Sequence, residues 1–338
     1  LQIIQSSCFY LQSITMKTQI AVLLASCLLF ESTGCGQTWE QPKAKVTIQA
    51  KDEQDDPVNG ATVRVGFTVK GTHQQKMLNG ETDIAGEFVG EGYSDIKLGA
   101  DLRKDGYYLS STGIVFTNAA NGQWLPWNPT LVAILRPIGK PVALYAKTVH
   151  TQIPKTNEPC GYDLEAGDWV TPYGKGLKKD LIFTIHQDYR GIQNYDLRGE
   201  LTYAKSLDGL QEISIPDIGK NSVFKWERQA PEGGYQPKFE IQNTWSPRGK
   251  VTRSFKNPDD WQGYFFRVRT VEQNNQIVSA HYGKIRGGIA VYPDNKSQKP
   301  KIVFTYYFNS TPNDRNLEWD PKKNLFGGLT DMETPREP

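Results

Sequence analysis

An excess of charge of either sign is missing from this chain of 338 residues. Lysine and arginine together number 39, against 37 aspartate and glutamate residues, which gives a formal net charge of +2. Binding to duplex nucleic acid needs a concentrated basic face, because contacts with the phosphate backbone dominate the affinity. We therefore expect no nucleic-acid partner. The hydrophobic fraction of 38% is enough for packed cores, and a disordered chain is excluded by composition.

A membrane-spanning apolar run is also missing. The run from Ile20 to Phe30 is shorter than the roughly 20 residues that a spanning helix needs. Met16 and Lys17 precede this run, and small residues follow it up to Gly36, which is the pattern of a secretory signal. We predict that residues 1–36 hold upstream residues and an export signal, and that the protein is exported.

Two cysteines near the end of this signal suggest a lipid anchor. Leu24-Ala25-Ser26-Cys27 has the letters of a bacterial lipobox but lies inside the apolar run. Thr33-Gly34-Cys35-Gly36 follows the run and resembles the junction of bacterial lipoproteins, although Ser32 stands where an aliphatic residue is expected. We predict lipidation at Cys35 and attachment to a bacterial membrane. Processing at Cys27, or plain secretion to the periplasm or the medium, remains an alternative.

Cysteine and histidine are scarce, with four of each. After export processing only Cys160 is expected to remain in the folded part, and one cysteine makes neither an internal disulfide nor a Cys-based zinc site. The histidines are His73, His150, His186 and His281, and their spacing does not predict a shared metal site. Gly-x-Ser-x-Gly, His-Glu-x-x-His and phosphate-binding glycine loops are missing from the sequence. We expect no cofactor, no metal and no catalytic residues.

Residues 42–138 show the pattern of a β-sandwich. Apolar residues recur at every second position from Ala61 to Val69, as in a strand with one buried face. Short alternating segments of this kind are separated by turn clusters such as Asp55-Asp56-Pro57-Val58-Asn59-Gly60. Because no segment has sustained helical periodicity, we predict a first all-β module over this range.

Three motifs of this module resemble the carboxypeptidase regulatory-like domain. They are Pro57-Val58-Asn59-Gly60-Ala61-Thr62-Val63, Thr82-Asp83-Ile84-Ala85-Gly86-Glu87-Phe88 and Lys104-Asp105-Gly106-Tyr107-Tyr108. The match covers about a quarter of the chain. The resemblance implies a seven-stranded, prealbumin-like sandwich without catalytic activity. The insert from Trp124 to Pro129 departs from the family pattern.

Residues 140–320 predict a second and larger all-β module. Eight strand candidates lie between residues 180 and 308, which is enough for a large antiparallel sandwich or a jelly-roll-like domain. Pro137 to Pro141 is expected to be a short, stiff linker, and residues 321–338 a polar tail. Tyr306-Tyr307-Phe308-Asn309 and the segment from Asn313 to Asp320 loosely resemble the C-terminal part of uncharacterised exported bacterial proteins.

Tryptophans beside turn residues are the candidate ligand-binding residues. A flat indole ring suits the apolar face of a sugar. The candidates are Trp124, Trp127, Trp169, Trp245 and Trp261. Large aromatics can equally close the ends of a sandwich core, and the sequence leaves this alternative open. We predict a non-enzymatic exported surface protein that binds a glycan or a cell-surface protein, or serves as a structural module.

Acidic loop residues provide the alternative, a carbohydrate-active enzyme. Glycoside hydrolysis needs two carboxyl groups about 5–10 Å apart across a sugar. The candidates are Asp163, Asp168, Asp188, Asp259 and Asp260, and the enzyme hypothesis fails if they lie on separate faces. Asp314, Asn316, Glu318 and Asp320 alternate like calcium ligands. The EF-hand pattern fails there, because Trp319 stands where its glycine is required.

Overall fold

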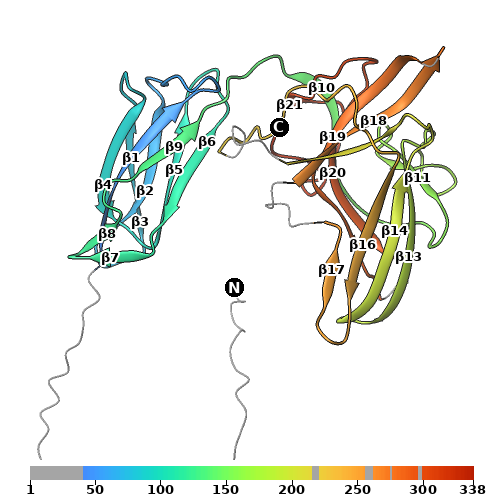
Figure 1. Cartoon of the computed structure of the whole chain (residues 1–338), viewed down its shortest axis with the longest axis horizontal. Helices are drawn as coiled ribbons and strands as arrows, with labels where there is room; N and C mark the ends of the chain where they lie inside the picture. Colours follow the sequence, from blue (N-terminus) through green and yellow to red (C-terminus); the bar gives the residue numbers. More distant parts are fainter. Residues whose placement is uncertain (1–40, 215–220, 256–261, 275, 296–298) are drawn as a thin grey trace, which may run out of the picture. The chain divides into compact units, whose positions relative to one another are not determined.

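The computed structural model describes residues 41–214, 221–255, 262–274, 276–295 and 299–338 (Figure 1). Over these ranges the chain is all-β, and it contains no helix that could cross a membrane. All of them belong to one compact unit. The expected export signal, Cys27, Cys35, Asp259, Asp260 and Trp261 lie outside the described residues.

The strands between residues 43 and 134 form one sheet of nine. Its strands are β1 (Lys43–Lys51), β2 (Thr62–Thr68), β3 (Gln75–Glu81), β4 (Glu87–Tyr93), β5 (Lys97–Arg103), β6 (Ser110–Val115), β7 (Asn118–Ala120), β8 (Gln123–Leu125) and β9 (Thr130–Ile134). This is two strands more than the resemblance implies. The short hairpin β7–β8 reaches into the insert at Trp124 and accounts for the additional pair.

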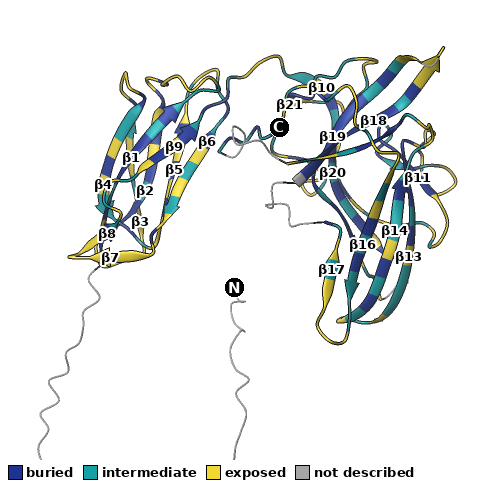
Figure 2. Ribbon diagram, in the orientation of Figure 1, coloured by how far each residue is buried: buried dark blue, intermediate teal, exposed yellow. Residues whose placement is uncertain are grey.

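These nine strands fall into two groups that share one residue pair. One group runs β6-β5-β2-β3, and the other runs β4-β1-β8-β7 with β9 beside β1. The shared pair is Thr68 and Tyr93. Side chains such as Val46 and Ile48 from β1 pack with Val63 from β2 in one core. Alternation therefore buries one face of each group and leaves the other exposed, as Figure 2 shows.

The strands after residue 141 form two sheets of six. The first, in spatial order β15-β18-β19-β20-β10-β21, holds β15 (Gly209–Ser214), β18 (Gln262–Gln273), β19 (Gln276–Tyr292), β20 (Lys301–Asn309), β10 (Val142–Gln152) and β21 (Trp319–Asn324). The second, in order β12-β11-β13-β14-β16-β17, holds β12 (Asp168–Trp169), β11 (Cys160–Asp163), β13 (Leu181–Gly191), β14 (Asn194–Thr202), β16 (Lys238–Trp245) and β17 (Val251–Arg253).

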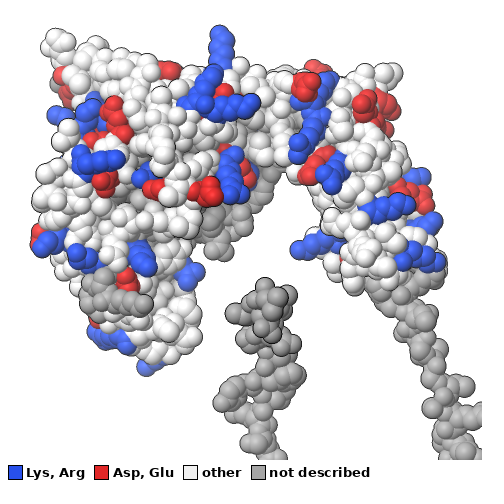
Figure 3. All heavy atoms as spheres, turned by 180° about the vertical axis from the view of Figure 1, so that it is seen from behind, with Lys and Arg blue, Asp and Glu red and all other residues white. Residues whose placement is uncertain are grey.

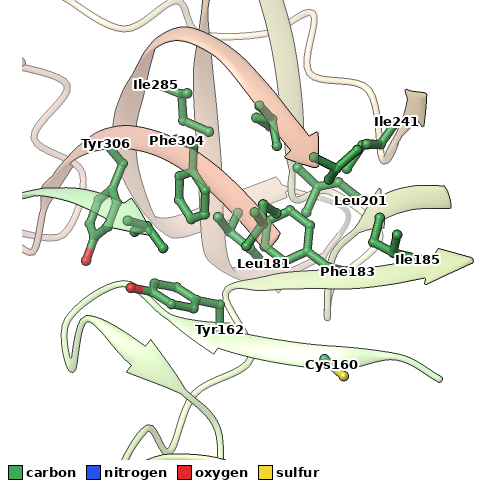
Figure 4. Close-up of a cluster of buried hydrophobic side chains, with 14 of the residues drawn as sticks. Cys160, Tyr162, Leu181, Phe183, Ile185, Leu201, Ile241, Ile285, Phe304 and Tyr306 are labelled. Atoms are coloured by element: carbon green, nitrogen blue, oxygen red, sulfur yellow. The ribbon is translucent and has the colours of Figure 1, made fainter. Parts of the chain in front are cut away.

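An aromatic-rich core joins these two sheets. Phe304 and Tyr306 of β20 lie opposite Phe183 of β13 and Tyr162 of β11 in Figure 4. The ring centroids of Phe183 and Phe304 are 5.8 Å apart, and those of Tyr162 and Phe304 are 5.7 Å apart. Residues from strands of both sheets are thus buried against each other, which is the arrangement of a β-sandwich.

Buried polar contacts cross from the nine-stranded sheet to the later part of the chain. Arg136 is 1% exposed, and its Nη1 donates to the carbonyl oxygens of Phe224 and Trp226, both at 2.8 Å. Its Nε donates to Glu53 at 2.6 Å, and Glu53 also accepts from Arg228 at 2.9 Å. Arg136, the residue before the linker at 137–141, is thus bonded to Glu53 in the part of the chain before the linker and to Phe224 and Trp226 in the part after it.

The segment from residue 321 onward is polar, as expected, but parts of it are packed. It contains most of β21, and the hydroxyl of Tyr307 donates to the carbonyl oxygen of Glu337. Lys147 forms an ion pair with Glu333 at 3.0 Å, and this contact lowers the pKa of Glu333 to about 2. The final residues therefore take part in the fold.

Candidate functional site

The outer face of the second six-stranded sheet is polar over four neighbouring strands. Inward positions of β13 hold Leu181, Phe183 and Ile185, so the residues between them point away from the core. Strand register then places outward residues in rows across the sheet. One row is His186, Arg198 and Gln242, and the next is Asp188, Asp196, Thr244 and Thr252.

Two adjoining concavities hollow this face. One has a volume of about 570 Å³ and is lined by Thr184, His186, Glu200, Lys238 and Glu240, among others. The other, about 540 Å³, is lined by Asp188, Arg190, Asp196, Trp245 and Lys250, among others. Both include Arg198 and Gln242, so they form one continuous depression, which we call the sheet groove. The volume of each concavity lies in the range of ligand sites.

Three ion pairs lie within the sheet groove itself. Arg190 bonds Asp188 at 2.6 Å, and Arg198 bonds Asp196 at 2.8 Å. Lys238 pairs with Glu200, and this hydrogen bond raises the pKa of Lys238. Positive and negative side chains are likewise interspersed over the molecular face in Figure 3. The groove therefore presents a mosaic of both charges and no single-sign field.

Several polar groups of the groove have no partner within the described part of the chain. They are the side-chain amide of Gln242 and the hydroxyls of Thr184, Thr244 and Thr252. His186 by contrast is oriented by Asn157, with 2.8 Å between Nδ1 and Oδ1. Unpartnered donors and acceptors in a depression are available to a ligand.

Like charges also face each other across the strands. Asp188 lies directly opposite Asp196, and Glu200 lies directly opposite Glu240. Such pairs destabilise a sheet by some tenths of a kcal/mol each. The Arg and Lys partners offset this repulsion on the same face.

Of the four predicted tryptophans that the structure describes, one lies in the groove. Trp245 is half-buried at one end, with its ring centroid 6.4 Å from that of Tyr195. Trp127 is partly exposed but lies in the loop between β8 and β9.

Two of the predicted tryptophans are core residues. Trp124 is 8% exposed and donates its ring N–H to Ser94, and Trp169 is 4% exposed and bonds Thr151. Their prediction as sugar-stacking residues was wrong, because their faces pack inside the two cores. The alternative reading, that large aromatics close the sandwich cores, applies to both.

Of the predicted carboxylates that the structure describes, Asp163 and Asp168 lie opposite each other on β11 and β12, and Asp188 lies apart from them. Asp163 is 4% exposed and accepts backbone N–H groups of Glu165, Ala166, Leu177 and Lys178, which together lower its pKa against the effect of burial. Asp168 likewise accepts from its own turn, at Lys175. Both shape the loop between β11 and β13, whereas Asp188 lies in the sheet groove.

A buried charge cluster lies behind that loop. Arg269 bonds both carboxylate oxygens of Asp180 at 2.8 Å and Glu165 at 2.6 Å. Burial raises the pKa of Asp180, while its partner Arg269 lowers it. Nε, Nη1 and Nη2 of Arg269 therefore each bond a carboxylate inside the fold, and the cluster has a structural role.

Neither the histidines nor the calcium-like segment is part of a group of ligands that could hold a metal ion in the described part of the chain. No group of three or more potential ligands gathers within the described ranges. Asp314 accepts the backbone N–H of Asn316, and Asn316 accepts that of Glu318, so the alternating polar residues cap turns. Glu318 is buried by other partners. Cys160 is buried in the core, where desolvation raises the pKa of its thiol.

Comparison with known proteins does not assign the chain to a family. No protein-family model and no curated protein matches the chain. Part of the chain is similar to 3-chlorocatechol 1,2-dioxygenase of Rhodococcus opacus 1CP, at 9% identity and a TM-score of 0.24 over 30% of this chain. The chain spans 62% of the length of the dioxygenase.

Two further structures align with more of the chain. One is a protein of Bacteroides uniformis ATCC 8492 proposed to bind carbohydrate, at 13% identity and a TM-score of 0.18, covering 78% of this chain and 98% of that one. The other is the major pilin subunit BcpA of Bacillus cereus, at 9% identity and a TM-score of 0.20, covering 82% and 99%. TM-scores of this size carry no argument about function.

The sequence reading missed most of the groove. Arg198, Gln242, Glu200 and Lys238 look like ordinary outward residues of strands. The one available signal is the repeat of Asp-x-Arg at Asp188-Tyr189-Arg190 and Asp196-Leu197-Arg198. Spacing of two keeps both members on one face of a strand, where they pair.

Proposed function

We propose that the sheet groove binds a neutral glycan chain and that the protein is a non-enzymatic binding module. The observation that supports this most is the continuous depression shared by Arg198 and Gln242, with unpartnered amide and hydroxyl groups in it. Sugar hydroxyls both donate and accept hydrogen bonds, so they match such a mixed set.

The charge pattern supports a neutral ligand. Asp188, Asp196 and Glu200 each already bond a cation of the same face. An anionic or cationic ligand would have to compete with these ion pairs. The hydroxyl groups of a neutral ligand can instead donate hydrogen bonds to the acceptor positions that a paired carboxylate leaves free. Trp245 at one end supplies an apolar surface for a sugar ring.

The proposed setting is the outside of a bacterial cell. The apolar run at 20–30 and Cys35 support export and lipid anchoring, with two acyl chains giving stable attachment. In this proposal the nine-stranded module is a carboxypeptidase regulatory-like spacer between the anchor and the glycan-binding sheet.

Calorimetry on the chain, with candidates chosen from a glycan array, tests the proposal. Arg198→Ala removes a residue common to both concavities and is expected to weaken binding about 10- to 100-fold, the effect of losing hydrogen bonds to a charged group. Trp245→Ala should weaken it as well. Arg64→Ala, on the exposed side of β2, is the matched control and should leave binding unchanged. Absence of binding to every polysaccharide would refute the glycan and leave a protein partner.

One observation favours the enzymatic alternative. Directly opposed residues such as Asp188 and Asp196 have Cβ atoms about 4.5–5.5 Å apart, and a retaining glycosidase holds its carboxyl groups about 5–5.5 Å apart. Each of these carboxylates is however already bonded to an arginine of its own strand, whereas glycoside hydrolysis needs both carboxyl groups to be directed at the sugar. Release of reducing ends from a bound glycan, abolished by Asp196→Asn, would establish an enzyme instead.

A further inference from the structure

Asparagine followed by glycine occurs at three places in the chain, and all three lie in the nine-stranded module. They are Asn59-Gly60, Asn79-Gly80 and Asn121-Gly122. The side-chain amide of an asparagine is open to attack by the backbone nitrogen of the next residue, and glycine, which has no Cβ, hinders that attack least. The three sites therefore share one chemistry and differ in how the fold holds the peptide group between the two residues.

The peptide group between Asn121 and Gly122 is not held by the fold. The two residues form the turn of the hairpin β7–β8, and their φ angles of 51° and 70° suit the type I′ turn that Asn-Gly favours. Both residues are exposed. Within the described part of the chain, neither the carbonyl oxygen and side-chain amide of Asn121 nor the N–H of Gly122 has a hydrogen-bond partner. A Cβ built on Gly122 would meet no atom within 4 Å, so the turn has open space around it.

The other two sites are held in place. The carbonyl oxygen of Asn59 accepts a hydrogen bond from Nζ of Lys104 at 2.5 Å, and the N–H of Gly60 donates to the carbonyl oxygen of Thr82 at 2.9 Å. Both polar atoms of that peptide group are therefore bonded. Asn79-Gly80 lies inside β3, which pairs with β2 over its whole length. Rotation of the backbone at either site works against these contacts.

We propose that Asn121 is a site of spontaneous deamidation, with water as the co-reactant. The nitrogen of Gly122 forms a bond to Cγ of Asn121, and the side-chain nitrogen leaves as ammonia with the proton of the Gly122 N–H. Water then opens either carbonyl–nitrogen bond of the resulting succinimide ring, which leaves an aspartyl or an isoaspartyl residue at position 121. The rotation that this attack requires breaks no hydrogen bond of the peptide group between Asn121 and Gly122.

The modification loosens the hairpin β7–β8 from β1. The carbonyl oxygen of Gly122 accepts the backbone N–H of Lys43 at 2.9 Å, and within the described residues Lys43 and Gln123 are the one pair that joins β1 to β8. An isoaspartyl residue adds one atom to the backbone before Gly122 and so displaces that carbonyl group. The N–H of Lys43 then exchanges its hydrogen with solvent more rapidly.

Mass spectrometry of the aged chain tests this inference. The folded chain is incubated in water labelled with heavy oxygen and then digested, and each site is followed by the mass gained when its NH2 group is replaced by labelled OH. We expect Asn121 to convert about tenfold faster than Asn59 or more, the factor that corresponds to breaking two hydrogen bonds. In the chain unfolded by urea the three sites should convert at similar rates. Conversion of Asn59 or Asn79 as fast as that of Asn121 in the folded chain would overturn the proposal, as would absence of conversion at Asn121.

Two variants separate the chemistry from its consequence. Asn121→Gly removes the amide and keeps the turn, since Gly-Gly also suits type I′, and hydrogen exchange at Lys43 should then stay constant as the chain ages. A rise equal to that of the unaltered chain would refute the link between the turn and β1. Lys104→Met is the matched control, because it releases the carbonyl oxygen of Asn59. It should speed conversion of Asn59 about threefold or more and leave Asn121 unchanged. An unchanged rate at Asn59 would refute protection by hydrogen bonds.

Discussion

The hydroxyl of Tyr108 donates a 2.8 Å hydrogen bond to Oε1 of Glu318, although the two residues are 210 positions apart. The same oxygen accepts the backbone N–H of Gly139 at 2.8 Å, and Oε2 accepts that of Lys140 at 3.0 Å. Glu318 is 1% exposed. The buried carboxylate of Glu318, the residue that precedes β21, thus binds both the loop before β6 and the linker.

Tyr108→Phe should lower the free energy of unfolding by roughly 1.5–3 kcal/mol, because the lost hydrogen bond has a charged acceptor. Urea unfolding followed by tryptophan fluorescence measures the loss. Tyr173→Phe is the matched control, since Tyr173 is 42% exposed, and it should change the free energy by less than about 0.5 kcal/mol. Equal effects of the two substitutions would contradict the importance of the Glu318 contact.

Lys284 should make stability depend on pH above neutrality. Its side chain is fully buried between the rings of Phe224 and Tyr307, at 5.1 and 4.9 Å, and its Nζ has no hydrogen-bond partner within the described ranges. Burial, together with the charge of Arg136, lowers the pKa of Lys284 to about 7. The unfolded chain binds this proton up to a pKa of about 10.4.

Between these two pKa values the unfolded state binds more protons, so the free energy of unfolding contributed by Lys284 increases as pH rises from about 7 to about 10. Lys284→Met removes the penalty of the buried charge. The variant should exceed the native protein in stability most at pH 7 and below, and the difference should vanish near pH 10.5. Thermal melts of both proteins across this range measure the difference, and a constant difference would refute the titration of Lys284.

Arg269→Ala should be strongly destabilising, because it leaves the 2% exposed carboxylate of Asp180 without its cation. Removing one partner of a buried pair costs about 3–5 kcal/mol. Arg190→Ala breaks an arginine–aspartate pair as well, but Arg190 is 68% exposed, and such surface pairs contribute about 0–1 kcal/mol. Calorimetric melting of both variants checks the contrast. Similar losses would mean that burial of the Asp180 pair is unimportant.

Cys35→Ser should move the protein from the membrane fraction to the soluble fraction, because lipidation requires that thiol. Cys160→Ser, inside the core, should leave the fractionation unchanged. Immunoblots of separated fractions distinguish the outcomes. Release by Cys27→Ser with retention of Cys35→Ser would identify the other cysteine as the modified one. Retention of both would rule out a lipoprotein.

Alternation of side chains was sufficient to predict the all-β fold. Ala61, Val63, Val65 and Phe67 are all buried, as the pattern from Ala61 to Val69 indicates. Val69 breaks the pattern, because β2 ends at Thr68 and the chain leaves the sheet. Local periodicity cannot show this end, since it coincides with the ends of the partner strands: Thr68 pairs with Gln75, the first residue of β3, and with Tyr93, the last residue of β4.

The candidate site was much less accessible to sequence reasoning. Asp163 was predicted as an acidic loop residue, but it is buried, and two of its backbone donors, Leu177 and Lys178, lie 14 and 15 positions away. The row of His186, Arg198 and Gln242 exists only once strand register is fixed. The alternating apolar residues of each segment determine which face these side chains take, but not which residues of the neighbouring strand lie opposite them, because a shift of two residues keeps the same face.

The parallel pairing of β1 with β9 determines how the first module bears mechanical load. The pairing runs from Thr47 with Thr130 to Lys51 with Ile134, so the start of β1 and the end of β9 lie at opposite ends of the pair. Tension applied at residues 43 and 134 pulls the strands along their length and loads the ladder hydrogen bonds together. The strand pair then resists the tension as a shear clamp, because its hydrogen bonds do not open one at a time. The unfolding rate of the module limits its extension under force.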